Sequence, residues 1–165
     1  MDKIELFEIK EGYDYGSTFW FLGRYDEKSK VHDMFCIEEE YVRDYLLPFI
    51  DKITKESFDY LDSKYFSKEM VYNLCNDIQN ISNVIQSNFN DPILDELKEN
   101  FSIFYIASDD EQKENDFMNM TKGEIMKFIE KNKERIIDFY KCFLERIKKL
   151  VDNMDDNKGI YISSP

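Results

Sequence analysis

The spacing of apolar residues changes near Glu39, and this change constrains the fold more than any other feature of the sequence. Before Glu39, apolar side chains alternate, as at Ile4 and Leu6, and the run from Thr18 to Leu22 is β-branched and aromatic. Both patterns predict strands. After Glu39, apolar residues recur every three or four positions, the spacing of one helix face. The sequence therefore predicts an α+β fold, in which a small amino-terminal antiparallel sheet of about two to four strands packs against about three or four helices.

A hairpin is predicted within this sheet. The segment from Val31 to Ile37 also alternates and follows the polar stretch 26–30, so it should pair back on residues 18–22 as a hairpin or three-strand meander. Because successive side chains of a strand point to opposite faces, Phe19 and Phe21 should share one face, and Trp20 and Leu22 the other. At least one of these faces should belong to the core. Residues 101–107 are consistent with either a further strand or a buried linker.

Helices are predicted in the middle of the chain. A stripe from Tyr41 to Ile53 is interrupted by Pro48, which implies a kinked helix or two short ones. Ser67 is placed as an N-cap for a stripe that runs to Ile85. A short helix should begin at Asp91 and Pro92 and end near Leu97.

A long carboxyl-terminal helix is predicted from about residue 122 to about residue 151. Thr121 and Glu124 have the spacing of a capping box, and Lys148 and Lys149 complement the negative end of the helix dipole. The tail of residues 153–165 is expected to fray, although Ile160 to Ile162 has the composition of an edge strand.

The size and composition predict one globular domain over residues 1–165. The chain has 165 residues with 14 Phe and 11 Tyr, which is enough for one core, and its 5 Gly and 3 Pro leave little material for flexible linkers. No secretory leader and no apolar run of about 18 residues is evident, so a cytoplasmic location is expected. Cys36, Cys75 and Cys142 are dispersed and predicted to be reduced core thiols.

The formal net charge of −13 favours some partners over others. Nucleic acid and anionic membranes are poor partners for such a chain, whereas a basic protein would be attracted to it. Residues 67–116 are the most acidic part, with 11 acids against 3 bases. If these acids share a face, they form the candidate surface for a basic partner; the plain alternative is a solvated surface that keeps the chain soluble. Together with two tyrosines in a predicted turn, the candidate partner-binding residues are Tyr13, Tyr15, Asp95, Glu96, Glu99, Asp109, Asp110 and Glu111.

The sequence carries no motif that names a reaction, so no catalytic, cofactor-binding or metal-binding residue is assigned. The one histidine, His32, shares a predicted strand face with Met34 and Cys36, and a small apolar layer explains this face more simply than a Cys-His pair. The cysteines lack the spacing of a zinc site, and no glycine-rich phosphate loop is present. A pair of catalytic carboxylates depends on the fold, and nothing in the sequence selects two of the 35 acids.

These observations lead to a functional expectation of a non-enzymatic, acidic protein-binding domain. Small acidic cytosolic proteins that neutralise nuclease toxins, such as bacterial immunity proteins, also use negative charge to attract a basic partner. An inhibitor of that kind is the expected function. The alternatives are an enzyme with an unrecognised carboxylate-based site and a structural or regulatory subunit whose acidity serves solubility.

Overall fold

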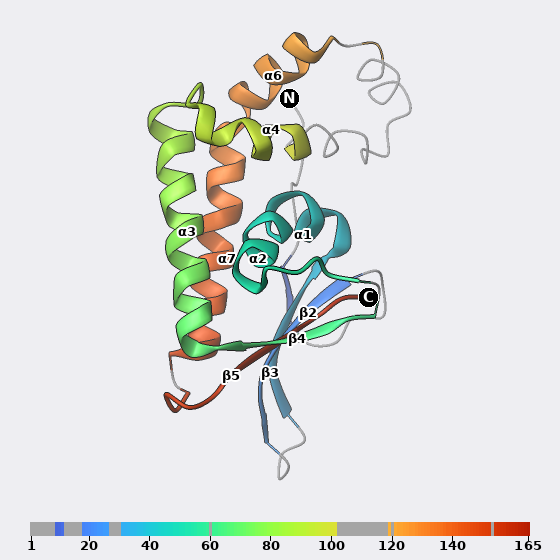
Figure 1. Cartoon of the computed structure of the whole chain (residues 1–165), viewed down its shortest axis with the longest axis vertical. Helices are drawn as coiled ribbons and strands as arrows, with labels where there is room; N and C mark the ends of the chain where they lie inside the picture. The colour runs from blue at the N-terminus through green and yellow to red at the C-terminus, as the bar shows by residue number, and fades with distance from the viewer. Residues whose placement is uncertain are drawn as a thin grey trace.

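The computed structural model describes residues 9–11, 18–26, 31–59, 61–101, 119, 121–152 and 154–165. The predicted α+β fold is confirmed (Figure 1). Within the described residues, five strands form one antiparallel sheet in the order β1-β3-β2-β5-β4. The strands are β1 (Ile9–Glu11), β2 (Thr18–Asp26), β3 (Val31–Glu38), β4 (Ser63–Ser67) and β5 (Gly159–Ser163). The helices are α1 (Glu39–Tyr45), α2 (Leu47–Thr54), α3 (Lys68–Ser87), the short 3₁₀ helix η1 (Pro92–Leu94), α4 (Asp95–Phe101), α6 (Lys122–Lys131) and α7 (Lys133–Val151).

The predicted hairpin is present as β2 and β3, which pair antiparallel with Phe21 opposite Phe35. The predicted division of faces is also confirmed. Phe19 and Phe21 are buried in the core, whereas Trp20 and Leu22 are half-buried on the other face. The predicted segment around Ile4 and Leu6 lies outside the described residues, as do residues 102–107.

The end of the chain differs from the expectation of a fraying tail. Residues 159–163 form β5, which lies between β2 and β4 and pairs with both. Ile160 and Ile162 are fully buried in the core, and their burial explains why the tail is ordered. The sheet therefore combines amino-terminal strands with one from the middle and one from the end of the chain.

The helices predicted around Ser67 and Pro48 are present. The Ser67 hydroxyl accepts a hydrogen bond from the Met70 amide at 3.2 Å at the start of α3. Pro48 lies in the first turn of α2, where its missing N–H costs nothing, so the interrupted stripe forms two short helices, α1 and α2.

The predicted helix 122–151 is divided in the structure. Its start is as predicted, because Thr121 and Glu124 form the capping box. At Asn132, however, the backbone amide bonds to the Ile129 carbonyl at 3.0 Å, one residue closer than in an α-helix. Asparagine favours such departures because its side chain competes for backbone hydrogen bonds. The result is two helices, α6 and α7, which run at an angle to each other (Figure 1).

The core lies between the sheet and the pair formed by α3 and α7, which run side by side (Figure 1). Phe21 stacks on Phe35 with ring centroids 4.7 Å apart, and Phe143 of α7 meets Phe21 edge to face at 5.4 Å. The buried Tyr140 hydroxyl donates to the Tyr45 carbonyl at 3.0 Å and so fixes the end of α1 on α7. The Phe49 ring of α2 meets the Tyr140 ring edge to face at 6.0 Å, so α7 holds both α1 and α2.

Candidate binding groove

A groove of about 830 Å³ lies among α1, α2, α3, η1 and α4. It exists because α2 packs on α3 while α1 packs on α4, which leaves side chains of all five elements facing a common space. Its lining is Arg43, Leu47, Pro48, Phe49, Asp51, Lys52, Asp77, Asn80, Ile81, Ile93, Glu96 and Leu97.

The apolar part of the lining includes one exposed anchor, Ile93, whose surface is 61% accessible. Ile93 is held in place because the Asp91 carboxylate accepts a hydrogen bond from the Ile93 amide at 3.0 Å and caps η1. The nearby Leu47 and Ile81 are half-buried. When a partner covers an exposed aliphatic side chain of this kind, the burial of apolar surface lowers the free energy of the complex.

The charged part of the lining contains three carboxylates and two cations. The carboxylates belong to Asp51 of α2, Asp77 of α3 and Glu96 of α4, and the cations to Arg43 of α1 and Lys52 of α2. Asp77 forms an ion pair with Lys52, with 3.8 Å between Nζ and Oδ2. This pair is weak, because the Lys52 side chain is 73% exposed and an exposed pair contributes little.

Asp51 differs from the other two carboxylates because it is partly buried. Its Oδ1 atom is shielded from solvent and has no hydrogen-bond partner among the residues that the structure describes. Burial raises the pKa of this carboxyl above its usual range, and the Phe58 backbone amide and Lys64 lower it by smaller amounts. Asp51 is therefore a carboxylate that is poorly solvated and only partly compensated.

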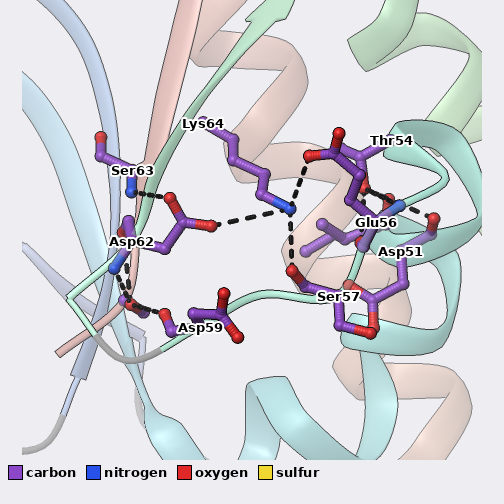
Figure 2. Close-up of polar contacts among 10 residues, drawn as sticks. Asp51, Thr54, Glu56, Ser57, Asp59, Asp62, Ser63 and Lys64 are labelled. Carbon is purple, nitrogen blue, oxygen red and sulfur yellow. Dashed lines mark hydrogen bonds and ion pairs between the residues drawn. The ribbon is translucent and has the colours of Figure 1, made fainter.

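Lys64 organises the segment that follows α2, as Figure 2 shows. From β4 its ammonium donates to the Ser57 carbonyl at 3.0 Å and lies 3.6 Å from both Glu56 Oε2 and Asp62 Oδ2. The Lys64 side chain is only 13% exposed and also covers the ring of Phe58. We assign this cluster a structural role, because its cation is already well paired and it holds the backbone next to Asp51.

The structure places only part of the predicted partner-binding set. Asp95 and Glu96 are exposed on α4, and Glu96 lines the groove. Glu99 also belongs to α4, but its side chain is outside the described part of the chain. The remaining members, Tyr13, Tyr15, Asp109, Asp110 and Glu111, lie outside the described residues. Whether the acidic middle segment forms one face thus stays a prediction.

Sequence reasoning missed Asp51, Asp77 and Ile93 as groove residues. Asp77 and Ile93 look like ordinary surface positions within predicted helices, and no local pattern shows that α3 and η1 meet α2. The one available signal was Pro48, which divides the helical stripe and allows α2 to turn against α3.

The other candidate side chains do not add a second site. Cys36 and Cys75 are buried as predicted, and burial raises the pKa of the Cys75 thiol to about 11. The prediction for Cys142 is wrong, because it is exposed on the outer side of α7. His32 lies in β3 opposite Tyr25, and its side chain is outside the description. Within the described ranges, no group of three or more metal-ligating side chains is found, and no helix is long and apolar enough to cross a membrane.

The groove combines apolar side chains with charged ones, and Ile93 and Glu96 of its lining are exposed. Comparison of the chain with protein-family models, with curated proteins and with solved structures gave no match.

Proposed function

We propose that the protein is a non-enzymatic binding domain for a basic protein partner. The observation that carries this proposal is the groove, whose lining combines an exposed aliphatic side chain, Ile93, with three carboxylates and only two cations. Such a combination suits a partner that presents cations next to apolar side chains.

The net charge of the chain supports the same proposal. A molecule of charge −13 attracts a basic partner over a distance and raises the rate of encounter. Glu96 connects this long-range effect with the groove, because it belongs to the most acidic part of the sequence and lines the groove. Ile93 would act after the encounter, when its burial slows dissociation.

The narrower form of the proposal is an inhibitor of the immunity type that acts in the cytoplasm. A nuclease toxin needs a cationic surface to hold the phosphates of its substrate. Carboxylates such as those of Asp95 and Glu96 would occupy that surface and exclude the nucleic acid.

The test is affinity capture with the tagged protein from its native cell at low and at high salt, followed by mass spectrometry. Two variants with equal loss of charge serve as comparison baits: D95N/E96Q on α4, and D138N/E145Q on the exposed side of α7. We expect the wild type and the α7 variant to retain one basic protein at low salt and release it at high salt. The α4 variant should retain much less of it.

Recovery of no stoichiometric basic protein by any bait would argue against the proposal. Equal recovery by both variants would instead mean that the acids on α4 are not the ones that matter. With the partner in hand, its association rate should fall steeply as salt screens the charges.

A carboxylate-based enzyme is the second candidate, and Asp51 is the observation that favours it. A carboxyl whose pKa is raised by burial keeps its proton at a higher pH and is suited to general acid catalysis. In a substrate screen, such an enzyme would show turnover that is lost in D51N without loss of folding. Turnover that persists in D51N would exclude this role for Asp51.

A further inference from the structure

We infer that the groove takes up an amphipathic helix of the partner, whose apolar stripe is flanked by lysine or arginine. This inference rests on the proposed function and adds the shape and chemistry of the segment that is bound. Three properties of the groove lead to it: the elements that line it, its size and its distribution of charge.

The elements that line the groove determine which form of peptide fits. All of the lining residues described belong to helices, so no strand edge offers backbone groups for the addition of a peptide strand. Phe49 is the one aromatic residue among them and is almost fully buried, whereas proline-rich segments bind grooves of exposed aromatic rings. Of these three modes of peptide recognition, a helix in a groove between helices is the one that fits this lining.

The size of the groove fits several side chains rather than one. A volume of about 830 Å³ is far larger than a single side chain needs. A bound helix presents a row of anchors at successive turns, typically about four of them at helix spacing. The lining includes apolar side chains from elements far apart in the sequence, Leu47 of α2 and Ile93 of η1. A row of anchors could therefore contact both elements.

The charges explain why the bound helix should be basic. Asp77 pairs with the exposed Lys52 at 3.8 Å, a contact that a cation of the partner can replace at little cost. With Arg43 as the second cation, the lining still carries three carboxylates against two positive charges. Glu96 is exposed on α4 and accessible to such a cation, whereas the unpaired oxygen of Asp51 is shielded from solvent. A lysine or arginine beside Asp77 and Glu96 would form charge-assisted hydrogen bonds with their carboxylates.

The test measures binding of labelled synthetic peptides by fluorescence anisotropy. The first peptide is an amphipathic helix of leucine and lysine, and the second has serine in place of each leucine and the same charge. The protein variants are I93S and D77N/E96Q in the groove. Their matched controls are L61S, which changes an aliphatic side chain even more exposed than Ile93, and D138N/E145Q on α7.

We expect the leucine-lysine peptide to bind the wild type at least about tenfold more tightly than the serine-lysine peptide. Each groove variant should lose about tenfold or more of this affinity, whereas the two controls should bind like the wild type. Circular dichroism of the bound peptide should show helix. Circular dichroism of each variant alone verifies that it is folded.

Equal binding of the two peptides, or equal effects of groove and control variants, would overturn the inference. In that case, a basic protein captured by the wild type at low salt would still support the proposed function. Failure to capture a basic protein, with the leucine-lysine peptide bound in the groove, would reject the proposed function and leave the groove as a helix-binding site.

Discussion

At the scale of single residues, burial disfavours the charged form of the Asp51 carboxyl, and we expect this to lower the stability of the fold at neutral pH. A residue that lowers stability and lines a groove is a candidate for a role in function, because function can require residues that reduce stability. The same scale shows where local chemistry is enough: Ser67, Thr121 and the alternation from Phe19 to Leu22 act through neighbours in the sequence, and their predictions are confirmed.

We expect the substitution D51N to stabilise the protein at pH 7. The pKa of Asp51 is higher in the folded than in the unfolded state, so the wild type loses stability as pH rises through the ordinary pKa of a carboxyl toward its folded value. The uncharged asparagine avoids this loss. Urea denaturation between pH 3 and pH 7 should therefore show a midpoint advantage for D51N that is largest at neutral pH and small in acid (about pH 3).

The control is D138N on α7, an exposed aspartate that should change the midpoint little at any pH. A lower midpoint for D51N than for the wild type at pH 7 would show that the ionised carboxylate makes a favourable contact that outweighs its burial.

At the scale of elements, what could be predicted depended on the distance between interacting residues along the chain. The hairpin β2–β3 and the start of α3 are local and were predicted, whereas β5 depends on strands about 100 residues or more away, such as β4, whose Ser63 contacts Ser163. A five-residue segment such as β5 has too short a pattern to show that both of its sides will be paired. The break at Asn132 was missed because the apolar stripe continues on both sides of it.

We expect the substitution G159A to destabilise the protein strongly. A Cβ at residue 159 would overlap the Phe66 carbonyl oxygen on the adjacent strand, and backbone cannot move aside without breaking the pairing of β4 and β5. We expect a loss of about 1–3 kcal/mol or more in the free energy of unfolding, as for other overpacked sites.

The matched control is G123A at the start of α6, where a Cβ would meet no atom within 4 Å. Alanine is the better helix former, so this variant should gain about 0.5–1 kcal/mol. Similar effects of both substitutions in urea denaturation would contradict the close approach of β5 to β4.

At the scale of the whole molecule, charge was predictable from composition, but the place where it acts was not. The acidity of residues 67–116 pointed to Glu96, and the structure adds Asp51 from outside that segment. The groove itself could not be predicted, because it depends on how five elements meet. Its position follows from packing between residues far apart in sequence, such as the contact of Tyr140 with Tyr45.

We expect moderate salt to raise the thermal midpoint of the protein. A chain of charge −13 repels itself when folded, and raising NaCl from about 10 mM to about 150 mM shortens the screening length from about 30 Å to about 8 Å. The control is the same comparison near pH 4.5, the isoelectric point, where the salt effect should largely disappear. A midpoint that falls with salt at pH 7 would mean that ion pairs outweigh the net repulsion.

The inward position of Lys64 also affects how the molecule behaves at high concentration. Among the described strands, β4 lies at an edge of the sheet, and an open edge is a template on which another chain can add a strand and begin to aggregate. An incoming strand would have to meet the ammonium of Lys64 and the carboxylates of Glu56 and Asp62 that surround it, and would have to dehydrate them. We therefore expect the charges around Lys64 to oppose the addition of a strand at the β4 edge.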